Sequence, residues 1–128
     1  MLNTVQVLKD LIRIDTSNPP GDEMRALEYI ASLLKVSGAT IALMPLADGK
    51  RGNLVAHLPG RKDGLAPLVM LSHIDVVPAD ASQWRFPPFE AVEADGFIYG
   101  RGAVDTKQLT VMELDAFLTL SKSGPLDR

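Results

Sequence analysis

The sequence predicts an α/β protein, specifically part of a three-layer α/β/α domain with a mixed sheet. Three observations support this prediction. Helical periodicity occurs near both ends of the chain, an apolar run typical of a buried strand lies near its middle, and shorter strand-like segments are bounded by turn residues. Such an order of elements favours helices on both sides of a short central sheet. The chain contains no internal repeat and no linker, so residues 1–128 are expected to form one unit.

Two amphipathic helices are predicted in the first 38 residues. The first has apolar residues at spacings of three and four, namely Leu2, Val5, Leu8, Leu11 and Ile12. It should end near Asp15, because residues 15–21 are rich in turn formers and Asn18 precedes a proline. The second helix is expected from about Asp22, whose charge suits a helix N-terminus, to a C-cap at Gly38.

Strands are predicted in the middle of the chain. Residues 40–46 and 53–58 are expected to be strands on either side of a turn, and residues 67–75 to form the buried central strand. Asp95-Gly96 between apolar residues indicates a second hairpin. A third helix is predicted over 106–121, before Gly124-Pro125 interrupts it.

Composition excludes several function classes. The hydrophobic fraction of 46% and charged fraction of 23% are ordinary for a soluble globular protein. A net charge of −3 without a basic cluster argues against nucleic acid as a partner. The absence of cysteine excludes disulfides, zinc–thiolate sites and a thiol nucleophile. The first residues carry helically spaced charges rather than a signal peptide, and no apolar run is long enough for a membrane span. The expected location is cytoplasmic.

A histidine and a carboxylate follow the predicted central strand. His73 and Asp75 are two residues apart, so in extended chain their side chains share one face. A carboxylate beside a histidine is a common way to orient a metal-binding imidazole. The alternative is a simple hydrogen bond between the two residues that caps the strand. From these two residues alone, both interpretations stay open.

A second acidic residue precedes the third helix. Asp105 follows a flexible segment in which Gly100 and Gly102 flank Arg101. It is a candidate ligand shared between two hard cations, with Arg101 pairing with a carboxylate to fix its rotamer. The alternative is an ordinary N-cap that accepts backbone N–H groups. Lys107 is expected to be solvated rather than catalytic.

Other residues are weaker candidates. We expect His57 to face solvent in an alternating strand, and Glu113 and Asp115 to lie on the solvated face of the third helix. Trp84, Phe86 and Phe89 either line a substrate pocket or fix a loop to the core. Thr16 and Ser17 have no histidine partner at a spacing that indicates a serine hydrolase.

Taken together, these segments resemble the M20 family of metallopeptidases, which includes aminoacylases, acetylornithine deacetylases, succinyl-diaminopimelate desuccinylases and glutamate carboxypeptidases. The resemblance is carried by four segments: Asp15-Thr16-Ser17-Asn18-Pro19-Pro20-Gly21, Ser72-His73-Ile74-Asp75-Val76-Val77-Pro78, Trp84 with Pro88-Phe89, and Gly100-Arg101-Gly102-Ala103-Val104-Asp105-Thr106-Lys107. They span nearly the whole chain, and the two central motifs in this order are specific. One departure is Gln108, where the family usually has glycine.

The resemblance implies a role for three of these residues. His73 would bind one metal of a pair, usually zinc with cobalt or manganese as substitutes, and Asp105 would bridge both ions. Asp75 would act in catalysis by orienting His73 rather than by binding metal. The implied fold is that of the zinc-peptidase catalytic domain. The implied reaction is attack of a metal-activated water on an amide bond of an N-acyl amino acid or small peptide.

The family pattern is also incomplete here. The family completes its site with a Glu-Glu pair, which supplies the general base and a ligand, and with a late histidine. This chain has no Glu-Glu dipeptide and no histidine after His73. Residues 1–128 are therefore interpreted as a truncated N-terminal portion of the catalytic domain of a hydrolase, without the dimerisation domain of a possibly homodimeric parent. The isolated chain is expected to have no significant hydrolase activity. The alternative is a catalytically inactive α/β module with a structural or binding role.

Overall fold

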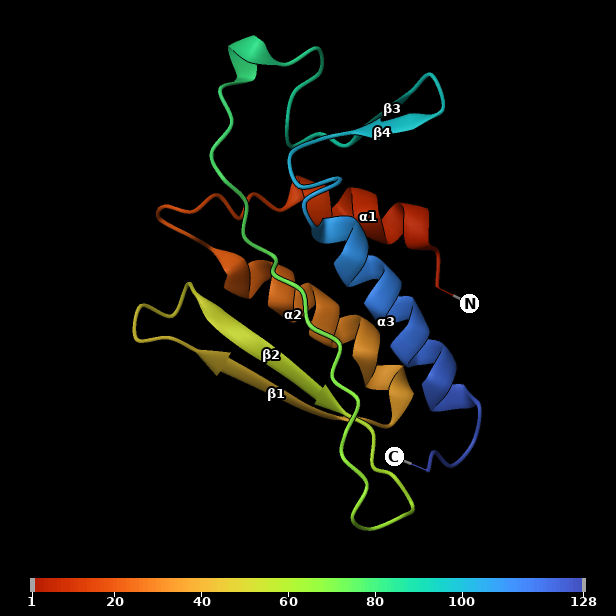
Figure 1. Ribbon diagram of the computed structural model, residues 1–128. Helices are drawn as coiled ribbons and strands as arrows, with labels where there is room; N and C mark the ends of the chain where they lie inside the picture. The colour runs from red at the N-terminus through yellow and green to blue at the C-terminus, as the bar shows by residue number, and fades with distance from the viewer. Residues whose placement is uncertain (1, 128) are drawn as a thin grey trace.

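The structure, a computed structural model, describes residues 2–127 and contains three helices, two hairpins and two short 3₁₀ turns (Figure 1). Its elements in chain order are α1 (Thr4–Arg13), α2 (Glu23–Leu34), η1 (Lys35–Ser37), β1 (Thr40–Pro45), β2 (Gly52–His57), η2 (Ala81–Gln83), β3 (Val92–Ala94), β4 (Phe97–Tyr99) and α3 (Lys107–Lys122). All three predicted helices and both predicted hairpins are confirmed. The observed helix boundaries differ from the predicted ones by only a few residues.

The helices form the core through their apolar faces. The side chain of Asn3 accepts a hydrogen bond from Gln6 N at 3.1 Å and so caps α1. Helix α1 packs against α3, and α2 packs against both strands of the first hairpin. The buried residues of the core are Val7, Leu11, Met24, Ala26, Leu27, Ile30, Leu34, Ile74, Val111, Leu114 and Leu118. Gly38, predicted as the C-cap of the second helix, adopts φ 72° as the C-cap of η1, which directly follows α2; the C-cap of α2 itself is Lys35.

The two hairpins lie at different ends of the molecule. Strands β1 and β2 pair antiparallel, with Thr40 opposite His57 and Pro45 opposite Gly52. Figure 1 shows this hairpin along α2, whereas the β3–β4 hairpin lies beyond α1. The turn of the second hairpin, Asp95-Gly96, has φ of 53° and 80°, as a two-residue turn that matches the strand twist requires.

The predicted central strand over residues 67–75 is wrong. This segment is extended and crosses the helices (Figure 1), but only Val76, at its end, forms a bridge, a parallel one with Ser17. A strand needs a neighbouring backbone as hydrogen-bond partner, and no other strand of residues 2–127 pairs with this segment. Three of its apolar side chains are largely exposed, with 71% of Leu68, 72% of Val69 and 84% of Leu71 accessible, whereas Ile74 is buried.

The α/β class is confirmed, although its sheet content differs from the expectation. The described residues contain two separate two-stranded antiparallel sheets in place of one mixed sheet. Segment 67–75, the expected central strand, pairs with neither of them. None of the helices in residues 2–127 has the length and apolar character needed to cross a membrane.

Tyr29 gives the first testable prediction. Its hydroxyl donates to Asp10 Oδ2 at 2.9 Å, and burial, this hydrogen bond and the charge of Asp10 raise the pKa of Tyr29 to about 12. The folded state therefore holds this proton more tightly than the unfolded chain, where a tyrosine pKa is about 10. The stabilisation should be complete below pH 10 and be lost as the pH rises from 10 towards 12.

We expect the difference in unfolding free energy between the wild type and Tyr29→Phe to shrink over that pH range, measured by urea unfolding at successive pH values. Absorbance at 295 nm should show the matching ionisation step, which Tyr29→Phe lacks. A tyrosinate step near pH 10 assigned to Tyr29 would contradict the prediction.

Candidate metal centre

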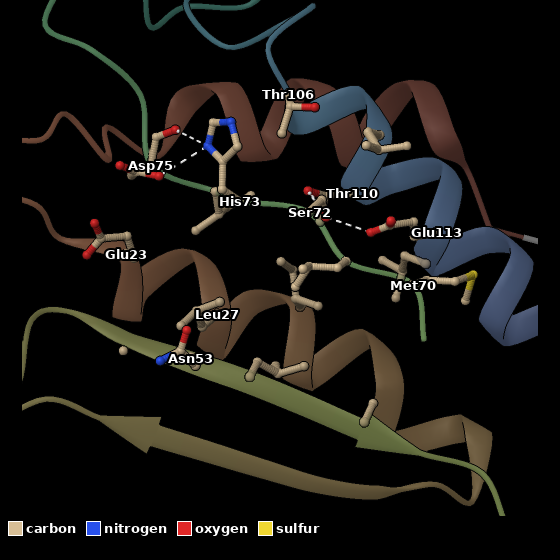
Figure 2. A pocket seen from close by; sticks show the side chains of 18 of the residues that line it. Glu23, Leu27, Asn53, Met70, Ser72, His73, Asp75, Thr106, Thr110 and Glu113 are labelled. Atoms are coloured by element: carbon tan, nitrogen blue, oxygen red, sulfur yellow. Dashed lines mark hydrogen bonds and ion pairs between the residues drawn. The ribbon is translucent and has the colours of Figure 1, made fainter. Parts of the chain in front are cut away.

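Side chains alternate along the extended segment that carries the predicted site. Ile74 and Val76 are buried against the helices, with 8% and 4% of their surface exposed, whereas His73 and Asp75 point to the other side. Figure 2 shows His73 and Asp75 together on that side. His73 Nδ1 lies 3.1 Å from Asp75 Oδ1 and 3.0 Å from the Asp75 carbonyl oxygen. The prediction from spacing that these side chains share a face is confirmed.

The other nitrogen of the imidazole faces Asp105. His73 Nε2 lies 3.3 Å from Asp105 Oδ1, although 32 residues separate the two in sequence. Asp105 lies two residues before α3, and its side chain is 89% exposed. Thr106 is the N-cap of α3, and none of the side-chain hydrogen bonds described for residues 2–127 joins Asp105 to a backbone N–H group. The structure therefore does not support the alternative that Asp105 is the N-cap of α3.

Two acidic groups and one amide determine the electrostatics of this cluster. Burial alone would lower the pKa of His73, but hydrogen bonds to the Asp75 carbonyl and to Asp105, together with the charge of Asp75, raise it overall. The pKa of Asp75 is lowered, chiefly because the side-chain amide of Asn18 donates a hydrogen bond to it and then because of the nearby imidazole. The cluster thus favours a cation between its two carboxylates.

The distance between His73 Nε2 and Asp105 Oδ1 suits a metal ion. Two ligand atoms bound to one tetrahedral zinc, at bond lengths of about 2.1 Å, lie about 3.4 Å apart. The observed 3.3 Å is therefore compatible with both atoms binding one ion. When Nδ1 carries the imidazole proton, Nε2 and Oδ1 are both acceptors, and only a proton or a cation between them makes their approach favourable.

The described residues supply only some of the ligands that a catalytic zinc ion needs. Among residues 2–127, no group of three or more His, Cys, Asp or Glu side chains is arranged to hold a metal ion. Catalytic zinc normally has three protein ligands. His73 and Asp105 fit two of these positions in type and distance, and Asp75 contacts the opposite nitrogen of the imidazole.

Lys107 is buried, so the expectation of a solvated side chain is wrong. Its accessible fraction is 0%, and its ammonium group donates to the carbonyl oxygens of Leu11 at 2.8 Å and Ile14 at 2.9 Å. Desolvation lowers the pKa of Lys107 to about 8, although the charge of Asp15 opposes this shift. Lys107 joins the start of α3, next to Asp105, to the C-terminal end of α1.

The loop after α1 is anchored to the segment that carries His73. Thr16, which is fully buried, donates from Oγ1 to the Ile74 carbonyl oxygen at 2.7 Å. Asn18 N donates to the Val76 carbonyl oxygen at 2.8 Å, and Asn18 Nδ2 donates to Asp75 Oδ2 at 3.1 Å. Residue patterns did not identify Asn18 as part of the site, although it lies in a loop that carries the family resemblance.

A groove of about 890 Å³ adjoins the site between segment 70–75, α2, α3 and β2 (Figure 2). On its wall, Ser72 Oγ donates to Glu113 Oε2 at 2.6 Å and lies 2.9 Å from Thr110 Oγ1. Glu113 is therefore half-buried and hydrogen-bonded, which corrects the expectation that it lies on a solvated helix face. His57 is exposed, as expected.

A smaller cavity, which His73 and Asp105 also line, includes Trp84 in its wall. The guanidinium of Arg101 lies over the Trp84 ring at 5.0 Å from its centroid, so Arg101 stacks on an aromatic face. None of the ion pairs in residues 2–127 contains Arg101, so the expected pairing of Arg101 with a carboxylate is not observed there. The rings of Phe86 and Tyr99 pack in a tilted arrangement with centroids 4.9 Å apart, which favours a structural role for Phe86.

The sequence is similar to one family model and to several known proteins. Residues 69–128 match the sequence model described as peptidase family M20/M25/M40. The N-fatty-acyl-amino acid synthase/hydrolase PM20D1 of Bos taurus is 46% identical over 87% of this chain and 23% of its own length. A probable succinyl-diaminopimelate desuccinylase of Staphylococcus epidermidis is 33% identical over 95% of this chain and 29% of its own.

The fold has a relative among solved structures. The crystal structure of human carnosine dipeptidase 1 superimposes with a TM-score of 0.74 at 26% identity, covering 92% of this chain and 28% of that protein. Across the curated relatives, the chain spans between 13% and 32% of their length. The chain therefore matches a part of each of these proteins.

Proposed function

Because this chain belongs to peptidase family M20/M25/M40, we propose that it forms part of a metal-dependent hydrolase that cleaves amide bonds. The proposed substrates are N-acyl amino acids or small peptides. Support for this class comes from similar proteins, which are named as an N-fatty-acyl-amino acid synthase/hydrolase, a probable succinyl-diaminopimelate desuccinylase and a carnosine dipeptidase. The alternative of an inactive structural module has no comparable support.

The observation that carries the proposal is the arrangement around His73. Its Nε2 and Asp105 Oδ1 face each other at 3.3 Å, while Asp75 contacts Nδ1 at 3.1 Å. We assign His73 and Asp105 as metal ligands and Asp75 as the residue that orients His73. The most suitable ion is zinc, which imidazole nitrogen and carboxylate oxygen both bind.

The residues of this chain would prepare the site in three ways. Asp75 keeps the imidazole proton on Nδ1, which leaves the Nε2 lone pair for the ion. Asp105 contributes negative charge that offsets the charge of the ion. Trp84 and Arg101 form a wall beside the cluster. The bound metal would supply the remaining chemistry, by polarising the amide carbonyl and by lowering the pKa of a water molecule.

Residues 1–128 are proposed to be the N-terminal portion of the catalytic domain. The sequence has no Glu-Glu dipeptide and no histidine after His73. The general base and the further ligands would come from other parts of a longer protein, consistent with the partial coverage of the relatives. A homodimeric parent enzyme and a cytoplasmic location stay predictions.

Zinc binding to the chain tests the proposal. We expect zinc to perturb the imidazole resonances of His73 and not those of His57, the other histidine of the chain. The affinity should be modest, because two protein ligands are fewer than zinc normally has. NMR titration of ¹⁵N-labelled histidine side chains measures this, with His57→Gln for assignment.

Two variants and one control make the test specific. His73→Ala and Asp105→Ala should each lower the zinc affinity by more than roughly tenfold, since even residues that only orient a ligand have effects of that size. His57→Gln should leave the affinity unchanged, because His57 is exposed on β2. Zinc binding that survives in both site variants, or that depends on His57, would refute the assignment of ligands.

A further inference from the structure

We propose that Asn18 is a positioning residue that sets the tautomer and orientation of His73 by holding the carboxylate of Asp75. This inference rests on the proposed function, in which His73 is a metal ligand. It adds a contact from the loop after α1, a segment distant in sequence from both central motifs.

The two oxygens of Asp75 have different partners. Asn18 Nδ2 donates to Oδ2 at 3.1 Å, and Oδ1 lies 3.1 Å from His73 Nδ1. An amide nitrogen is a donor only, so it fixes Oδ2 as an acceptor and stabilises the ionised carboxylate. With Oδ2 held, rotation of the carboxylate is restricted and Oδ1 stays directed at the imidazole. A proton on Nδ1 is then favoured, and the lone pair of Nε2 is directed at Asp105.

The backbone of Asn18 is anchored to the same segment as its side chain. Asn18 N donates to the Val76 carbonyl oxygen at 2.8 Å, and Val76 N donates to the Thr16 carbonyl oxygen at 3.2 Å. These two bonds form the parallel bridge between Ser17 and Val76. The Asn18 side chain is therefore presented to Asp75 from a fixed backbone, as a positioning role requires.

A purely structural role for Asn18 predicts a different outcome. In that case Asn18 only fastens the loop, as Thr16 does through its bond of 2.7 Å to the Ile74 carbonyl oxygen. Thr16 holds the same loop to the same segment but has no contact with Asp75. Thr16→Val is therefore a matched control, because it loosens the loop and leaves the carboxylate and its amide donor in place.

The experiment measures the tautomer of the neutral His73 imidazole by ¹⁵N NMR of the metal-free chain. Asp105 competes for this proton with one oxygen, 3.3 Å from Nε2, whereas Asp75 offers two oxygens at 3.0 and 3.1 Å from Nδ1. We therefore expect the wild type to carry the proton mainly on Nδ1. In Asn18→Ala and in Asn18→Asp, which keeps the size of the side chain but not the donor, the equilibrium should move towards the Nε2 tautomer. Thr16→Val should keep the wild-type pattern. An unchanged tautomer in both Asn18 variants, or an equal change in Thr16→Val, would overturn the proposal.

Zinc affinity provides the second measurement. The Asn18 variants should bind zinc about tenfold more weakly than the wild type, the usual effect of losing a residue that orients a ligand, and Thr16→Val should differ by less than about twofold. If the wild-type chain binds no zinc, the assignment of His73 and Asp105 as metal ligands is refuted. A tautomer shift between the wild type and the Asn18 variants would still support the role of Asn18.

Discussion

Lys107→Met should destabilise the fold by about 2–4 kcal/mol, because it removes two hydrogen bonds from a charged donor, each worth about 1.5–3 kcal/mol. The loss is smaller than their sum, because the Leu11 carbonyl oxygen still accepts from Ile14 N at 3.2 Å and the Ile14 contact is only part-buried. Methionine keeps most of the length of the side chain, so the apolar contacts of its stem remain and the loss reports on the ammonium group. The carbonyl oxygens concerned belong to Leu11 and Ile14, at 2.8 and 2.9 Å. Urea unfolding followed by circular dichroism measures the effect.

The same substitution elsewhere in α3 is the control. Lys122 lies in the last turn of α3 and is exposed. Lys122→Met should change stability by no more than about 0.5 kcal/mol, as is usual for a surface substitution. Equal losses for the two variants would show that the buried ammonium group contributes nothing beyond helix propensity.

Lys107 also illustrates why the sequence predicted some features and missed others. Periodicity gives the helix that begins at Lys107, because the apolar positions of α3 recur at helical spacing. It does not say that a charged residue at the start of α3 reaches 0% exposure, since this depends on carbonyl oxygens 93 and 96 residues earlier in the chain. Burial of a charge is a property of the tertiary structure.

In the candidate site, too, some contacts could be predicted from the sequence and others could not. The spacing of His73 and Asp75 predicts that their side chains lie together, because alternation in extended chain is a local property. The contact of Asn18 with Asp75 and that of Ser72 with Glu113 join segments 57 and 41 residues apart. No local pattern specifies such pairs. The prediction of a central strand was wrong for a related reason, because a strand requires a neighbouring strand as hydrogen-bond partner as well as an apolar run.

Gly102→Ala should also destabilise the chain by about 2–4 kcal/mol. Gly102 has φ +82°, where a Cβ costs about 1–2 kcal/mol. A Cβ here would also lie 2.8 Å from Val76 Cγ1 and 3.1 Å from Lys107 Cδ, and such overpacking typically costs about 1–3 kcal/mol. Val76 is 4% exposed and β-branched, so it has little freedom to move away.

Gly96→Ala separates the two causes. Gly96 has nearly the same backbone conformation, φ +80°, but nothing lies within 4 Å of its Cβ position. It should therefore show only the conformational cost of about 1–2 kcal/mol, and the excess loss in Gly102→Ala measures the clash. Because Val76 follows Asp75 directly, the clash should also disturb the His73 imidazole resonances in Gly102→Ala and leave them unchanged in Gly96→Ala. Equal destabilisation with unaltered His73 resonances would mean that the segment before α3 is free to shift, and that close packing against Val76 does not hold Asp105 near His73.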